Sequence, residues 1–231
     1  SFVSIGGAVD HEDYTPKMSE EYGDDWKMFP VKGMGSPEIL RSMIWSEKPD
    51  IIWFMTDPHR WVWLWQMEDE IRHNIPMVYY HVWDNYPYPR FNRIWYESTD
   101  VVVAASKLTE DVVRTVAPGV ETIYIPHAVN TDVFKRLQDD EMEVFRKKHL
   151  GEDSDKFVFF WNNRNGRRKH PGTLLLWFKD FLDTVGHEKA MLLMHTNPHD
   201  PVGLDIEYII NDLGLSEQRQ VMISPTKFED E

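Results

Sequence analysis

Four basic residues fall between positions 164 and 169 of a chain whose formal net charge is −14. An apolar run that starts at Phe157 precedes them, and Pro171 after them opens an amphipathic segment that continues to Val185. A strand, a basic loop and a helix start in this order direct free backbone N–H groups and the positive end of the helix dipole at the loop. The pattern predicts a site for an anion.

Two of these residues, Arg164 and Lys169, have the spacing to reach one diphosphate from two sides, the arginine as a bidentate fork and the lysine as a point charge. Gly166 between them would allow the backbone to approach the anion closely. Taken alone, the loop fits an ordinary solvated charge cluster equally well.

A second candidate is His81, which follows the apolar strand predicted at 76–80. An imidazole there could hydrogen-bond a substrate hydroxyl or relay a proton. Asp84, three residues on, could orient that imidazole or contact a second substrate. A histidine at a strand end is more often structural, so this alternative stays open.

The composition limits the classes of partner. Asp and Glu number 39 against 25 Lys and Arg, which argues against broad binding to nucleic acid or to an anionic membrane. The chain has no cysteine, which favours a reducing compartment, and we expect a cytoplasmic protein. No apolar run approaches the roughly 18 residues of a membrane span.

A metal centre and bound cofactors are not expected. The side chains that could suggest a metal have no H-E-x-x-H spacing among them. These side chains are Asp57, His59, His195, His199, Asp200 and Asp205. The chain also has no G-x-G-x-x-G turn, phosphate-binding P-loop or G-x-S-x-G elbow.

Predicted strands alternate with predicted helices through short connections, which indicates an α/β fold with parallel sheets. The continuous apolar run at 51–55 suits a strand buried on both faces. Helices are expected at 60–72, 108–116, 141–149, 171–185 and 205–213, and the later strands at 100–105, 122–125, 157–162, 190–195 and 220–224. The stretch 131–155 is strongly charged, and we place a domain boundary there.

Several of these segments together resemble the retaining GT-B glycosyltransferases of family four. Ile125–Phe134, I-P-H-A-V-N-T-D-V-F, resembles the family's I-P-(N/H)-G-V-D-x-x-x-F segment. Arg164-x-x-x-x-Lys169 is similar to its G-R-x-x-x-x-K-G loop, and His81 is similar to its cleft histidine. Ser106 resembles the residue that begins the last helix of the N-terminal domain.

The resemblance implies two Rossmann-like domains and transfer of a sugar, with retention, from a nucleoside diphosphate to a glycan, lipid or small-molecule acceptor. Residues 1–133 would form the acceptor-side domain, 134–155 a linker with a helix, and 156–231 the first half of the donor domain. Arg164, Gly166 and Lys169 would bind the donor diphosphate without a metal, and His81 would be the catalytic-cleft residue. Trp83, Asp84 and Tyr86 would contact the acceptor, since aromatic faces pack on sugar rings.

The chain departs from the family pattern at four points. Ala128 and Asn163 stand where the family usually has glycine. The family's Gly-rich loop has no counterpart before Phe2, and its E-x7-E motif has none before Glu231. We therefore expect a fragment that is inactive by itself. The alternatives are a nucleotide-sugar epimerase of similar fold, a non-catalytic glycan-binding module and, more distantly, a nucleic-acid-binding protein.

Overall fold

Two units make up the computed structural model of this chain, which describes residues 2–6, 17–21, 23–31, 33–215 and 219–224. The first unit ends at Thr131 and the second begins at Asp132. The predicted linker, 134–155, thus belongs to the second unit, while the predicted acceptor-side and donor-side roles stay predictions.

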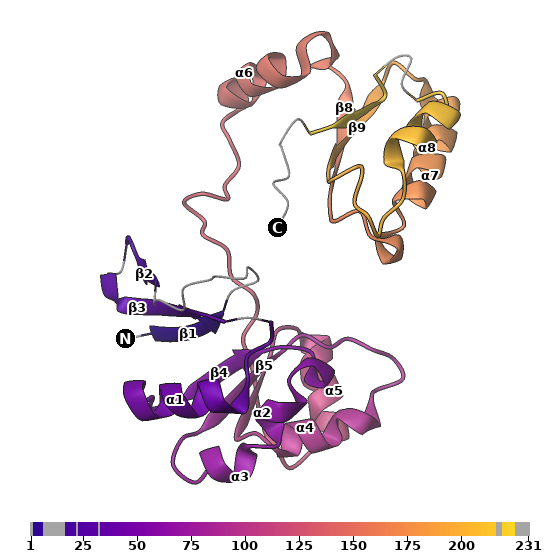
Figure 1. Ribbon diagram of the computed structural model, residues 1–231. Coiled ribbons are helices and arrows are strands. Elements are labelled where there is room, and N and C mark those ends of the chain that lie inside the picture. The colour runs from indigo at the N-terminus through magenta and orange to yellow at the C-terminus, as the bar shows by residue number, and fades with distance from the viewer. Residues whose placement is uncertain (1, 7–16, 22, 32, 216–218, 225–231) are drawn as a thin grey trace. The chain divides into compact units, whose positions relative to one another are not determined.

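The first unit is built on a parallel sheet with the strand order β4-β5-β6-β7 (Figure 1). Its strands are β4 Ile52–Met55, β5 Met77–His81, β6 Val101–Ala104 and β7 Glu121–Tyr124. Its helices are α1 Pro37–Glu47, α2 Val62–Trp65, α3 Glu68–Ile71, α4 Arg93–Glu97 and α5 Lys107–Val116. The predicted α/β alternation with parallel pairing is confirmed.

A smaller sheet lies beside these elements in the first unit. It consists of β1 Phe2–Gly6, β2 Lys17–Ser19 and β3 Gly23–Pro30, with β1 parallel and β2 antiparallel to β3. The sequence predicts strands at 2–9 and 27–30, which β1 and the end of β3 confirm, although residues 7–9 lie outside the described ranges. It does not predict β2 or the charged start of β3.

Aromatic rings fill the core under the larger sheet. Tyr79 is fully buried and stacks on Phe54, with 5.2 Å between ring centroids. Trp65 meets Tyr79 edge to face at 5.3 Å, and its indole N–H donates to the Trp95 carbonyl at 3.0 Å. Each ring therefore removes a large apolar area from water, and the polar edge of Trp65 is also satisfied.

Two expectations for this unit are wrong. Only Phe54 is buried in β4, while Trp53 and Met55 remain 47% and 55% exposed, because β4 is an edge strand. The single helix expected at 60–72 is instead a 3-10 turn, Pro58–Arg60, followed by α2 and α3. The α2 sequence V-W-L-W consists largely of weak helix formers, and burial of Leu64, Trp65 and Met67 favours a turn between the two short helices.

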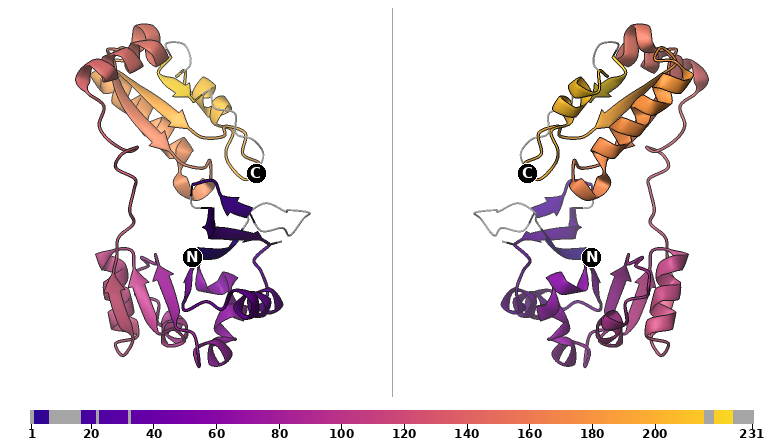
Figure 2. Two further views of the ribbon diagram at one scale, coloured as in Figure 1. Left: turned by 90° about the vertical axis from the view of Figure 1, so that its left-hand side faces the viewer. Right: turned by 90° about the vertical axis from the view of Figure 1, so that its right-hand side faces the viewer.

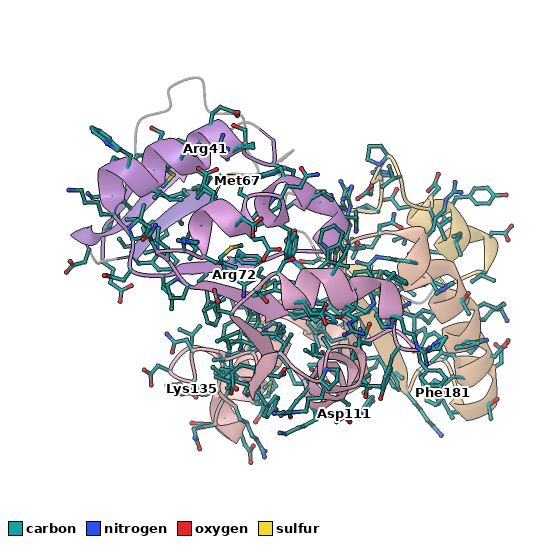
Figure 3. All side chains as sticks on the ribbon, turned by 90° about the horizontal axis from the view of Figure 1, so that it is seen from below. Arg41, Met67, Arg72, Asp111, Lys135 and Phe181 are labelled. Carbon is teal, nitrogen blue, oxygen red and sulfur yellow. The ribbon has the colours of Figure 1, made fainter. Side chains whose placement is uncertain are left out.

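Polar contacts connect the outer helices of this unit to its strands. Asp100, just before β6, accepts the Met77 N–H at 2.8 Å and the Arg72 Nε–H at 3.2 Å. Arg41 of α1 donates from Nε to Glu70 of α3 at 2.8 Å, and Figure 3 labels Arg41 and also Arg72, which directly follows α3. The Asp100 contacts join the end of α3 to β5, whereas the half-exposed Arg41–Glu70 pair joins two helices and contributes little stability.

The second unit is built on a three-stranded parallel sheet of order β10-β9-β8, with α7 along it (Figure 2). Its elements are α6 Asp139–Leu150, β8 Phe157–Asn162, α7 Pro171–Val185, β9 Ala190–His195, α8 Ile206–Asp212 and β10 Val221–Ile223. The predicted bounds of β8, α7 and β9 are confirmed to the residue. Periodicity predicted these bounds well because α7 buries one stripe, Leu175, Phe178 and Leu182, against the sheet.

Replacing Leu175 with alanine should destabilise the second unit by about 2–5 kcal/mol, because the fully buried side chain leaves a cavity between α7 and the sheet. The matched control is Leu176→Ala on the same helix, where the side chain is 47% exposed. Hydrogen exchange of peptides from the second unit in increasing urea measures the difference. Equal protection in the two variants would contradict this account of the core.

Candidate functional site

The loops that follow β8 and β9 leave the sheet at the same edge. Asn162 of β8 lies opposite His195 of β9 in the parallel register, so the loop 163–170 and the loop 196–205 start side by side. The carboxyl edge of a parallel sheet is where ligands of α/β proteins bind. The predicted anion loop is therefore at the expected edge of the second unit.

Arg164 is held by a carboxylate from the neighbouring loop. Its Nε–H donates to Asp200 Oδ2 at 2.6 Å and its Nη2–H to Oδ1 at 3.3 Å. This hydrogen bond is the main cause that lowers the pKa of Asp200 from its ordinary value and raises that of Arg164. Arg164 is 72% exposed, while the Asp200 side chain is only 7% exposed. The guanidinium of Arg164 is thus exposed to solvent, while the carboxylate that holds it is almost buried.

Asn165 joins the same two loops from inside the unit. Its side chain is fully buried, donates to the Leu204 carbonyl at 2.7 Å and to the Pro198 carbonyl at 3.3 Å, and accepts the Leu204 N–H at 3.1 Å. A buried amide with all of these bonds made fixes the backbone on both sides. Sequence reasoning missed this residue, since one asparagine within N-N-R-N-G has no distinguishing pattern.

Lys169 differs from Arg164 in having no fixed partner. It ends the 3-10 turn Arg167–Lys169, is half-buried, and its ammonium has no hydrogen-bond or ion-pair partner among the residues that the structure describes. His170, in the left-handed region with φ 51°, begins α7 without a side-chain cap. The first N–H groups of α7 and the Lys169 ammonium are therefore both available to an anion.

The backbone conformation at Gly166 does not require a glycine. Its φ and ψ, −110° and 143°, suit any residue, and an added Cβ would have no neighbour closer than the Arg164 carbonyl oxygen at 4.0 Å. An added Cβ would therefore be tolerated in this structure, and the close approach of a ligand to this backbone stays a prediction.

A groove of about 480 Å³ lies next to this loop. One of its walls is the first two turns of α7. The residues that line it are Trp161, Lys169, His170, Thr173, Leu174 and Trp177. The lysine is thus set at the margin of an apolar surface, where its charge is less screened than in open water.

His81 is placed differently from the prediction. It ends β5, is 1% exposed, and its Nε2 lies 2.8 Å from the Tyr96 hydroxyl. The rings of Tyr79 and Tyr96 pack against it at 4.7 and 5.0 Å. Burial lowers the pKa of His81 to about 3, so it is neutral near pH 7. A direct substrate contact needs exposed atoms, so this geometry favours the structural alternative, and the catalytic role remains a prediction.

The residues after His81 form a partly exposed aromatic loop. Trp83 is half-buried, 6.3 Å from the His81 ring, and its indole N–H is buried with no partner among the described residues. Asp84 is exposed, and Tyr86 is 86% exposed, in edge-to-face contact with Tyr88 at 5.9 Å. The structure leaves Trp83, Asp84 and Tyr86 at the carboxyl edge of the first unit, and their acceptor role stays a prediction.

Two other predicted segments can be located. Ser106 caps α5, accepting the Thr109 N–H at 3.0 Å. The Tyr80 hydroxyl donates to the Ile125 carbonyl at 3.2 Å and lies 3.0 Å from His127 Nδ1, which ties the start of the 125–134 segment to β5.

No metal cluster is evident in the parts of the chain that the structure describes. They contain no group of three or more His, Asp or Glu side chains that could hold an ion. His195 and His199 are four residues apart, but they lie on β9 and in the following loop rather than on one helix face. In the same ranges, no helix is long and apolar enough to cross a membrane.

Of the comparisons with known proteins, the one with solved structures finds matches. No protein-family model matches the sequence, and no curated protein matches it. HepE from Anabaena, solved with UDP and glucose, has a TM-score of 0.59 at 16% identity, over 86% of this chain and 55% of that one. The α,α-trehalose 6-phosphate synthase of Burkholderia multivorans has a TM-score of 0.65 at 13% identity, over 98% and 66%.

A third similar structure, from E. coli and bound with UDP-2-fluoro glucose, has a TM-score of 0.62 at 12% identity, over 98% of this chain and 67% of that one. The chain thus spans just over half of the Anabaena protein and about two thirds of the other two. At such identities the likeness shows the fold, which is α/β with the Rossmann-like, parallel-sheet units of the GT-B class.

Replacing Gly203 with alanine should destabilise the second unit by about 1–3 kcal/mol through overpacking. The new Cβ would overlap the Asn165 backbone oxygen and lie 2.6 Å from its side-chain amide carbon and nitrogen. Gly166→Ala is the control in the facing loop, where the same atom meets open space. Thermal unfolding measures both variants, and a loss of stability in Gly166→Ala but not in Gly203→Ala would contradict the packing described.

The burial of His81 should make the first unit less stable in acid. In the unfolded chain the imidazole takes up a proton as the pH falls below about 6.5, whereas in the folded chain it stays neutral down to about pH 3. Its contribution is therefore complete above pH 6.5 and is lost between pH 6.5 and 3, at up to about 1.4 kcal/mol per pH unit.

The loss of stability of the first unit in acid should be smaller in His81→Gln, which has no group to protonate at this position. The control is His59→Gln, which removes an exposed histidine and should keep the full loss. Urea unfolding at several pH values between 4 and 7 measures the slope. An acid slope that is the same in His81→Gln as in the wild-type chain would show that the imidazole is not held neutral.

Proposed function

We propose that this chain is part of a glycosyltransferase that moves a sugar from a nucleoside diphosphate donor to an acceptor, with retention of configuration. The observation that carries the proposal is the basic loop between β8 and α7. In a fold of the GT-B class, it presents the anchored guanidinium of Arg164 beside the start of α7, which has no side-chain cap. It also presents the ammonium of Lys169, which has no partner among the described residues.

The chemistry of the reaction explains why these groups are useful. Breaking the bond between the sugar and the diphosphate increases the negative charge on the departing oxygen. Fixed donors aimed at that charge lower the barrier, because they need no reorganisation when the bond breaks. Arg164 offers a planar fork, Lys169 a point charge, and α7 its N–H groups and dipole. In this proposal the transfer uses no metal.

The similar structures support the class of donor. The Anabaena protein was solved with UDP and glucose, and the E. coli protein with UDP-2-fluoro glucose. For the present chain we propose a nucleoside diphosphate sugar as donor and a glycan, lipid or small-molecule acceptor contacted by Trp83, Asp84 and Tyr86. We also propose a cytoplasmic protein that does not bind nucleic acid.

His81 takes an indirect part in this proposal. Because its ring is buried and neutral, it would act by supporting the loop that begins with Trp83, to which it is the stacked neighbour. Proton transfer at the acceptor would then depend on an exposed group such as Asp84.

Binding of a nucleoside diphosphate tests the proposal directly. Calorimetry of the 231-residue chain with UDP, GDP, ADP and CDP should show heat for at least one of them. In Arg164→Ala or Lys169→Ala, that affinity should fall at least about tenfold, since each removes a charge-assisted hydrogen bond.

The matched control is Lys179→Ala, which removes a lysine of α7 that pairs with Asp183. Its affinity should stay within about twofold of the wild-type chain. Absence of heat with every nucleotide, together with heat for a glycan panel, would favour a glycan-binding module instead. For the complete enzyme, sugar turnover without any acceptor requirement would favour an epimerase.

A further inference from the structure

We propose that Asp200 is a positioning residue for Arg164, which holds one edge of the guanidinium so that the other edge faces the donor diphosphate. This inference rests on the proposed function. Asp200 takes the Nε–H at 2.6 Å and one Nη2–H at 3.3 Å. Arginine carries five N–H donors in a fixed plane, so Nη1 and the second Nη2–H remain directed outward.

The carboxylate of Asp200 is itself held in place. The Val202 N–H donates to its Oδ1 at 3.0 Å, and its backbone oxygen accepts the Gly203 N–H at 2.9 Å. With 7% of its side chain exposed, Asp200 has little freedom to follow the arginine into solvent. The pair thus consists of an exposed guanidinium and a carboxylate that is fixed in place. In many surface ion pairs, by contrast, both partners are free to move.

The backbone of Arg164 is fixed from the other side by its neighbour. Asn165 is fully buried and makes three hydrogen bonds to the loop that carries Asp200, two of them with Leu204. The arginine is therefore tied at its backbone through Asn165 and at its guanidinium through Asp200. A side chain held at both ends loses little rotamer freedom on binding an anion, which is the advantage of preorganisation.

Asp200 also carries a negative charge, which by itself repels an anion. The hydrogen bond from Arg164 lowers the pKa of Asp200, so this charge is present near neutral pH. Positioning and repulsion have opposite signs, and they can be separated because positioning requires Arg164 whereas repulsion does not.

The test is a double-mutant cycle with inorganic pyrophosphate as the probe, measured by calorimetry on the 231-residue chain. In the wild-type background, Asp200→Asn should weaken pyrophosphate binding about fivefold, because the arginine is released. In the Arg164→Ala background, the same substitution should leave the affinity unchanged or make it tighter, since only the repulsion is removed. Asp183→Asn, which removes an exposed carboxylate of α7, is the control in both backgrounds.

A structural role alone would give a different pattern. If Asp200→Asn weakens binding equally in both backgrounds, Asp200 holds the loop and not the guanidinium, and the proposal is overturned. If it tightens binding in both, Asp200 only repels or competes with the anion, and the proposal is overturned as well.

A second measurement does not depend on a variant that folds. By NMR of the wild-type chain, the Nε–H of Arg164 should exchange with water more slowly than those of Arg167 and Arg168, which are exposed and have no ion-pair partner among the described residues. Equal exchange rates for the three arginines would contradict a held guanidinium.

Comparing pyrophosphate with nucleoside diphosphates separates this proposal from the proposed function. Pyrophosphate binding with the predicted cycle, but no heat with any nucleoside diphosphate, would support Asp200 as the positioning residue of an anion site and overturn the donor role. If the wild-type chain does not bind pyrophosphate either, both proposals fall.

Discussion

The buried amide of Asn165 is the contact on which the candidate site depends. It bonds only to backbone groups of the facing loop, so the loops after β8 and β9 become one body at the carboxyl edge of the second sheet. The parallel register brings the two loops to the same edge, but it does not fix their conformations. A polar side chain with no exposure and all bonds made does fix them, because any other arrangement would leave a buried amide unpaired. The backbone of Arg164, the residue just before Asn165, is therefore held in place as well.

The elements that the sequence predicted well are those whose own pattern decides them. α7 runs from a proline at its first position to a glycine after its last, and its apolar stripe repeats with the helix period. β8 and β9 are apolar runs bounded by polar residues. The elements predicted poorly depend on distant partners. β4 is apolar throughout but is an edge strand, and the segment 60–72 breaks where its tryptophans find separate places in the core.

The candidate site divides in the same way. The basic loop and its position before a helix could be predicted from the sequence, because charge and periodicity are local properties. The ion-pair partner of Arg164 could not be predicted, since Asp200 lies 36 residues away. The sequence indicated Asp200 only as a weak candidate for a metal ligand. His81 was found as a strand-end histidine, but its depth is decided by Tyr79 and Tyr96, which close over it. Whether a polar residue faces solvent or the core depends on tertiary packing that no spacing reveals.

Arg164 and Lys169, two of the four cations of the loop, illustrate how an acidic chain can attract an anion. A net charge of −14 produces a field that repels diphosphate at long range, although salt screens most of it beyond about 8 Å. Attraction must therefore come from groups close to the ligand. Asp200 offsets much of the charge of Arg164 and also orients its guanidinium. Arg164 therefore supplies mainly well-directed N–H donors for the anion. Lys169 lies beside an apolar groove and has no ion-pair partner in the part of the chain that the structure describes, so its charge can attract the anion. Geometry and charge are thus divided between two residues, Arg164 with its carboxylate partner and Lys169, for which the described residues supply no ion-pair partner.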